Sequence, residues 1–133
     1  MNHLNIRSLT SSRFWMLPLL LLPVFVVADE PPQSAFRSPA DMTVEERTTL
    51  MSLVGKYNTC VYNEGMARVD QFPDIRQAAD AAMGACENTI NQLRAQIETY
   101  RFEPAFGEHF AHHAQSRAAR TLLPELVLKK SGN

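Results

Sequence analysis

The stretch of sequence that decides the fold runs from Asp74 to Tyr100 and reads DIRQAADAAMGACENTINQLRAQIETY. Its apolar residues recur at intervals of three and four, which places them on one face of a helix. Asp74 can cap the first turn, and Gln77 stands where the reciprocal member of a capping box belongs. The pattern therefore predicts one long helix over 74–100. The predicted apolar stripe consists of Ile75, Ala79, Ala82, Met83, Cys86, Ile90, Leu93, Ile97 and Tyr100.

A second helix is predicted before this stretch. Thr43 and Glu46 have the spacing of a capping box, and apolar residues follow them at helical intervals. We expect this helix to span 44–70, because Pro73 has no N–H to donate and forces the residue before it toward an extended conformation.

A third helix is predicted after the stretch. Pro104 suits the first position of a helix, where its missing N–H is not needed. Apolar residues continue at helical spacing, so we predict a helix over 104–122 that Pro124 ends or kinks. Alternation of β-branched and aromatic residues, the sign of a strand, is absent from the sequence. The expected fold class is thus all-α, a small three-helix domain whose first two helices form an antiparallel hairpin.

The first 28 residues are expected to lie outside this domain. Two arginines precede residues 14–28 (FWMLPLLLLPVFVVA), which carry no charge and end in small residues. This is the layout of a secretory signal peptide over 1–28, with cleavage after Ala28. A retained membrane anchor is the alternative, but an uncharged helix of this length rises only about 22 Å, and the hydrocarbon core is about 30 Å thick.

The signal peptide predicts an exported protein, periplasmic if the source is a Gram-negative bacterium and otherwise secreted. It would meet the membrane only through the signal segment, and only if that segment stays uncleaved. Residues 29–42 are rich in proline and mixed charge, which predicts a disordered leader and leaves 43–133 as the helical domain.

The composition fits one small globular domain, since 45% of the 133 residues are hydrophobic and 20% are charged. Without residues 1–28 the chain holds 11 basic and 14 acidic residues. A basic excess that could neutralise a phosphate backbone is therefore lacking, and we expect no nucleic-acid partner.

Cys60 and Cys86 are the two cysteines of the chain. In a small exported domain an even number of cysteines usually forms disulfides. Counting outward from the predicted turn near Pro73 places the two cysteines within about 1.5 Å of the same height on the two arms of the hairpin. We therefore predict a structural disulfide. A redox-active pair is the alternative, but the two residues form no CxxC motif and stand at no predicted helix start.

Three histidines lie close together after Glu108, within the predicted third helix. His109 and His113 share a helix face, whereas His112 stands one turn from Glu108. Two imidazoles at that spacing can chelate Zn, Cu or Ni, but a closed site needs four ligands and the sequence offers no evident third. Three interpretations stay open: a solvated helix face, a metal site, and a contact surface that responds to pH.

The sequence contains no visible constellation of nucleophile, base and orienting group, so we expect neither enzymatic activity nor a resident cofactor. Its C-terminal segment holds more apolar residues than a three-helix core of this size requires, which indicates a contact surface. We expect an accessory or protein-interaction module with an unknown protein partner, and the alternative is a metal-binding or metal- and pH-sensing protein. The predicted contact residues are Leu122, Leu123, Leu126, Val127 and Leu128.

Overall fold

The structure, a computed structural model, describes residues 36–132. Regular structure in this range is entirely helical, apart from an isolated bridge between Arg37 and Phe102. The all-α prediction is confirmed for the described part of the chain. The predicted signal peptide over 1–28, and the predicted leader as far as residue 35, lie outside the described residues. Within 36–132 we find no helix with both the length and the apolar character needed to cross a membrane.

Helix α1 (Val44–Arg68) begins at the capping box that the sequence predicted. The Thr43 hydroxyl accepts a hydrogen bond from the Glu46 N–H at 3.1 Å, and the Glu46 carboxylate accepts one from the Thr43 N–H at 2.9 Å. These bonds satisfy N–H groups that have no partner within the helix. A 3-10 turn, η2 (Val69–Gln71), follows the helix, in agreement with a predicted end near residue 70.

The single helix predicted over 74–100 is wrong, because two helices occupy this range, α2 (Ile75–Ala85) and α3 (Glu87–Thr99). The break falls at Cys86, whose φ of −98° and ψ of 12° depart from helical values. Cys86 is the residue that the disulfide ties to α1. Gly84, a weak helix former, stands two residues earlier. The apolar spacing continues through the break and therefore carries no sign of it.

The third helix begins at Pro104, as predicted, but its predicted end at residue 122 is wrong. Helix α4 (Pro104–Ser131) continues through Pro124. A proline inside a helix costs about 3 kcal/mol. Leu122 and Leu126 are almost completely buried, and burial of each such side chain contributes about 1.5–3 kcal/mol. The free energy gained by burying these side chains offsets the cost of Pro124, so the helix continues to Ser131.

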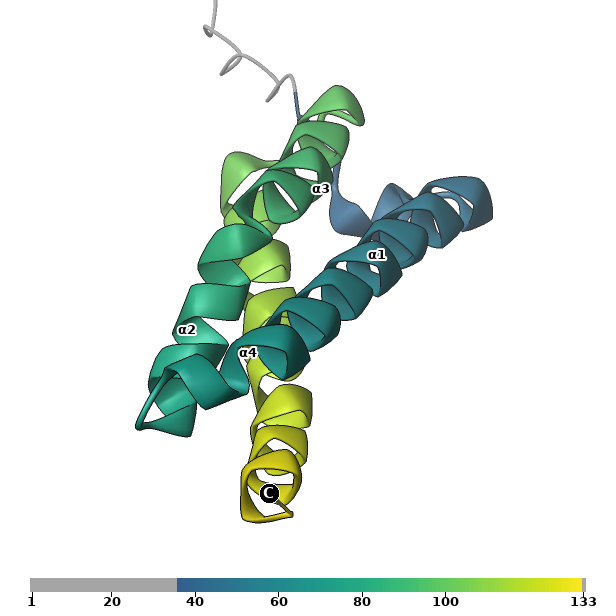
Figure 1. The fold of residues 1–133 in the computed structure, drawn as a ribbon. Coiled ribbons are helices and arrows are strands. Elements are labelled where there is room, and N and C mark those ends of the chain that lie inside the picture. The colour runs from purple at the N-terminus through teal and green to yellow at the C-terminus, as the bar shows by residue number, and fades with distance from the viewer. Residues whose placement is uncertain (1–35, 133) are drawn as a thin grey trace, which may run out of the picture. The chain divides into compact units, whose positions relative to one another are not determined.

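Helix α1 packs against the other three helices, and α4 packs against both α2 and α3. In Figure 1, α2 and α3 follow one another as a bent rod, and α1 crosses in front of α4. The three rods match the predicted three-helix domain, with one rod broken into two helices. The largest buried side chains between them are Leu50, Tyr57, Val61, Ile90, Leu93, Ile97, Phe102, Leu122 and Leu126.

Helices α1 and α4 approach one another closely at Gly65. A Cβ atom built at Gly65 would lie 2.7 Å from Cδ2 of Leu122, well inside van der Waals contact. The absence of a side chain at Gly65 thus lets Leu122 fill the space where the two helices cross.

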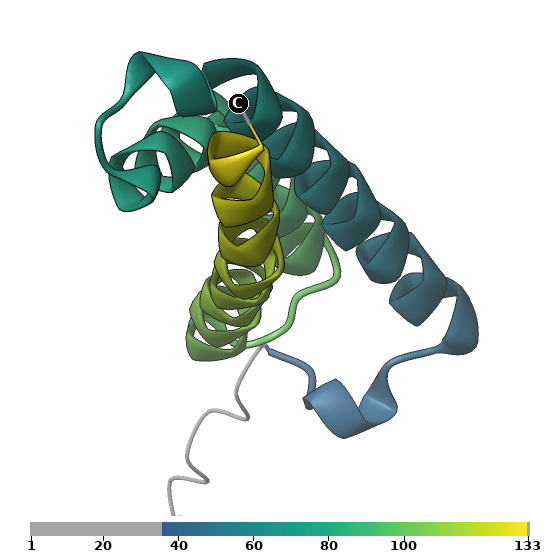
Figure 2. The same cartoon turned by 60° about the horizontal axis from the view of Figure 1, so that its bottom comes forward.

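Residues 36–42, at the end of the predicted leader, lie against the helical body. The Arg37 N–H donates a hydrogen bond to the Arg101 carbonyl at 2.7 Å, and the Arg37 guanidinium pairs with the Glu46 carboxylate at 2.6 Å. The same guanidinium lies 5.0 Å from the centre of the Phe102 ring. Arg37 therefore links the start of α1 to the turn between α3 and α4, and Figure 2 shows the chain spanning these two places.

Candidate functional site

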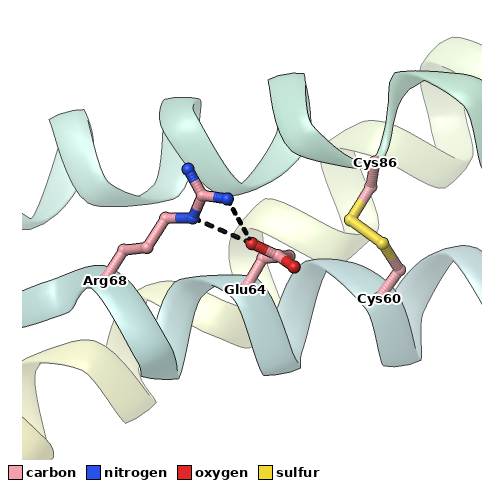
Figure 3. Close-up of a disulfide and its surroundings, with 4 residues drawn as sticks. All are labelled: Cys60, Glu64, Arg68 and Cys86. Atoms are coloured by element: carbon pink, nitrogen blue, oxygen red, sulfur yellow. Dashed lines mark hydrogen bonds and ion pairs between the residues drawn. A yellow bond between two sulfur atoms is a disulfide. The ribbon is translucent and has the colours of Figure 1, made fainter.

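Cys60 and Cys86 form the predicted disulfide, with their Cα atoms 6.0 Å apart. Figure 3 shows the bond joining α1 to the residue that follows α2, beside the ion pair of Glu64 and Arg68. Cys86 is buried, and no free cysteine is found within the described residues. A bridge between two packed helices, with one partner in the core, fits a structural role.

The three histidines lie on the outside of α4. His109, His112 and His113 are all exposed. His109 and His112 line a shallow hollow of about 510 Å³ together with Glu108 and Ala105. Over residues 36–132, no three potential ligands among His, Cys, Asp and Glu come together around one point. The described chain thus offers a metal ion exposed imidazoles but no closed site.

The five predicted contact residues divide between the core and the surface. Leu122 and Leu126 are buried, and Leu123 is half-buried. Val127 and Leu128 are 48% and 65% exposed. Most of the apolar surplus that the sequence suggested is therefore core, and two of the five side chains remain available for contact.

Two lysines hold the end of α4 against the turn of the hairpin. The Lys129 ammonium donates a hydrogen bond to the Met66 carbonyl, in the last turn of α1. The Lys130 ammonium donates to the carbonyls of Phe72 and Pro73, the latter at 2.8 Å. These carbonyls lie at a helix end and a turn, where the backbone leaves acceptors without partners. The C-terminal segment is therefore an integral part of the fold.

Three of the six exposed large apolar side chains in the described range lie on α1. Val44, Met51 and Tyr62 are 75%, 51% and 42% exposed. Their spacing, with Thr48 between them, places them on one side of the helix, and we call these four residues the α1 face. Between residues 48 and 63, Lys56 is the only charged residue. Sequence reasoning missed this face because α1 has an apolar stripe on its inner side as well. The scarcity of charge was the signal that could have revealed it.

A groove of about 460 Å³ opens between the bent rod of α2 and α3 and the middle of α4. Its walls come from segments about 30 residues apart, so no local pattern in the sequence indicated it. The lining residues are Met83, Gly84, Glu87, Ile90, Arg94, His112, Gln115, Ser116 and Ala119.

Tyr57 brings a polar atom into the core. The residue is fully buried, and its hydroxyl has no hydrogen bond of acceptable geometry within the described residues. Burial raises the pKa of Tyr57, while the nearby Gln115 amide and the Arg94 charge act in the opposite direction. Tyr57 is not among the residues that line the groove.

The described residues thus form a helical body that is crosslinked by one disulfide. Its surface carries the uncharged α1 face, three exposed histidines and the groove between the α2–α3 rod and α4. The chain matches no protein-family model, no curated protein sequence and no solved structure at a level that indicates a relationship.

Proposed function

We propose that the protein is an exported, non-enzymatic accessory module that binds another protein through the α1 face and the exposed apolar end of α4. The observation that carries this proposal is the exposure of Val44, Met51 and Leu128, each more than half exposed. Large apolar side chains exposed on a folded domain favour a contact site, since their exposure to water is unfavourable.

The chemistry of the surface defines the partner. The α1 face carries no charge, so a charged partner would lose its hydration there without gaining a counter-charge. A partner helix with its own apolar side chains fits such a surface, because apolar side chains on neighbouring turns supply the anchors of helix recognition.

Site-specific photo-crosslinking tests this proposal. A photoreactive amino acid at Met51 or at Leu128 should capture the same protein, and the Tyr62→Glu substitution should abolish its capture at Met51. A photoreactive residue at Arg76, exposed on α2, is the matched control and should not capture that protein. The same products at all three positions, or none at Met51, would contradict the proposal. Truncation of the C-terminus is unsuitable as a test, because Leu122 and Leu126 belong to the core.

Export rests on the sequence of residues 1–28 and is supported by the disulfide, since such bonds persist in oxidising compartments. Mass spectrometry of the protein from the exported fraction should give an N-terminus at Asp29 and a mass two hydrogens below that of the dithiol. A mature protein that retains residues 14–28 would contradict cleavage, and a protein found only inside the cell would contradict export.

Metal binding is the second candidate, favoured by the exposure of His109 and His113 one turn apart on a continuous helix. A transition metal binds neutral imidazole, so affinity should fall as the pH is lowered. Calorimetric titration of Zn, Cu and Ni should show micromolar binding that the double variant His109→Ala, His113→Ala loses. Equal weak binding by both proteins would identify the histidines as a solvated helix face.

A further inference from the structure

The groove between the α2–α3 rod and α4 is not used by the protein docking proposed for the α1 face. Its volume of about 460 Å³ lies within the range of small-molecule sites, about 300–1,000 Å³. Helix α1 contributes no residue to its lining, so the groove and the α1 face are separate surfaces.

Two side chains of opposite charge, Glu87 and Arg94, line the groove. Glu87 stands seven residues before Arg94 on α3, which is a rise of about 10.5 Å along the helix axis. Arg94 also donates a long hydrogen bond to Glu108. A ligand that pairs with both Glu87 and Arg94 must therefore carry an anion and a cation separated by about that length.

The polar groups of the groove are available to a ligand. The Glu87 carboxylate, the His112 imidazole and the Ser116 hydroxyl make no hydrogen bond or ion pair with any residue in 36–132. Arg94 donates to Asn91 at 2.9 Å through Nη1 and to Glu108 at a long 3.4 Å through Nε, which leaves Nη2 without a partner in that range.

We propose that the groove binds a short peptide with free termini, about three residues long. An extended chain spans at most about 3.3–3.6 Å per residue, so three residues match the rise of about 10.5 Å between Glu87 and Arg94. Arg94 pairs with the terminal carboxylate, and Glu87 pairs with the terminal ammonium. Gln115 and Ser116 line the groove from α4 and supply donors and acceptors for the peptide groups. Met83, Ile90 and Ala119 give an apolar floor for small side chains.

Other ligand classes fit this groove less well. A simple anion would pair with Arg94 but would leave the carboxylate of Glu87 without a partner. An apolar molecule would cover Glu87, His112 and Ser116 without pairing them, at the cost of burying polar groups. A peptide with both termini free can pair with Glu87 and Arg94 and can also form hydrogen bonds with the polar groups that α4 contributes to the groove.

Titration of the disulfide-intact protein with tri-alanine, followed by NMR chemical shifts, tests the proposal. We expect saturable shifts of groove residues. N-acetylation or C-terminal amidation of the peptide should each weaken binding at least five-fold. The Glu87→Gln variant should become insensitive to acetylation and the Arg94→Gln variant insensitive to amidation, which assigns each terminus to its residue.

Two open glycines provide a matched pair of steric variants. A Cβ atom built at Gly84 or at Gly55 meets nothing within 4 Å, so both helices accept a larger side chain. Gly84→Leu fills the groove and should abolish tri-alanine binding, whereas Gly55→Leu on α1 should leave it unchanged. Equal binding of the free and capped peptides, binding retained by Gly84→Leu, or no saturable binding at 10 mM peptide would each overturn the proposal. None of these results bears on the α1 face, whose test is separate.

Discussion

Tyr57 is a residue whose packing and polarity oppose one another. Its ring fills the core, but its hydroxyl is buried without a partner within the described residues. Tyr57→Phe keeps the ring and removes the unpaired group, so we expect the free energy of unfolding in urea to rise by about 1 kcal/mol. Tyr62→Phe, on the exposed α1 face, is the control and should have little effect. A loss of stability in Tyr57→Phe would show that the hydroxyl is paired in solution.

The raised pKa of Tyr57 predicts a second property of that residue. Its ordinary pKa is 10.0, and burial raises the pKa in the folded protein. Above pH 10 the unfolded chain therefore releases this proton while the folded protein keeps it, and the stability falls as the pH rises. In Tyr57→Phe this part of the alkaline loss should be absent. Urea titrations of both proteins between pH 8 and 11 measure the difference, and parallel curves would contradict the assignment.

The pair of Arg37 and Glu46 predicts the opposite dependence on pH. A hydrogen bond from the Arg37 guanidinium lowers the pKa of Glu46, and the backbone N–H of Thr43 lowers it further. A lowered pKa contributes stability above the ordinary value of 4.5, and that contribution is lost as the pH falls through the folded value. Arg37→Gln should therefore be less stable than the natural protein at pH 7, and the difference should shrink below pH 4.5. Arg47→Gln, which changes an exposed arginine of α1 next to Glu46 in sequence, is the control for thermal unfolding at both pH values.

Side-chain roles were predictable from sequence where they depend on neighbours along the chain. The capping box of Thr43 and Glu46 is such a case, because both partners lie within one turn. The role of Arg37 was not predictable, since it pairs with residues of α1 and of the turn after α3, and the local sequence around it is rich in proline. The exposure of Met51 was likewise hidden, because helical spacing alone cannot tell an inner apolar face from an outer one.

The crossing of α1 and α4 at Gly65 predicts opposite effects on stability for two glycine-to-alanine substitutions in α1. Alanine in place of glycine inside a helix gains about 0.5–1 kcal/mol when space is available. At Gly65 the new methyl group would collide with Leu122, and overpacking costs about 1–3 kcal/mol. Gly65→Ala should therefore lose stability, whereas Gly55→Ala on the same helix should gain it. Chemical denaturation of the two variants compares them directly, and equal gains would show that α1 and α4 do not meet at Gly65.

Helix starts were easier to predict than helix ends and breaks. Thr43 and Pro104 mark starts through hydrogen-bonding chemistry that is local. The break at Cys86 occurs at a disulfide with a residue 26 positions away. The continuation of α4 through Pro124 depends on the burial of Leu126 and on the bond of Lys130 to the hairpin turn. These contacts form only when the helices pack, so a pattern read along the chain could not contain them.

The disulfide governs the stability of the whole molecule. It closes a loop of 26 residues, which in the chain-entropy model stabilises the folded state by about 3.5 kcal/mol. A domain of this size has a total stability of about 5–15 kcal/mol. The double variant Cys60→Ala, Cys86→Ala should lose a large part of that stability in a urea titration. Reductant should bring the natural protein close to the variant and leave the variant itself unchanged. A loss below about 1 kcal/mol would mean that helix packing alone fixes the hairpin.

The arrangement of the whole molecule was predictable in outline, and its candidate sites were less so. Two cysteines at matching heights on two predicted helices were enough to pair Cys60 with Cys86. The groove requires Glu87 on α3 and Ser116 on α4 to line the same hollow, and that depends on how the broken rod packs against α4. No spacing within one helix records this packing, so the groove could be found only in three dimensions.

The covalent ring from Cys60 to Cys86 also affects how the protein responds to proteases. The turn at Pro73 and Asp74 is exposed and lies inside the ring, so a cut there leaves both pieces joined through sulfur. The ammonium group of Lys130 holds the carbonyl of Pro73 beside the cut. A nicked copy would thus remain one molecule until a reductant opened the bridge. The lifetime of the protein among peptidases would then depend on the redox state of its surroundings as much as on the peptidases themselves.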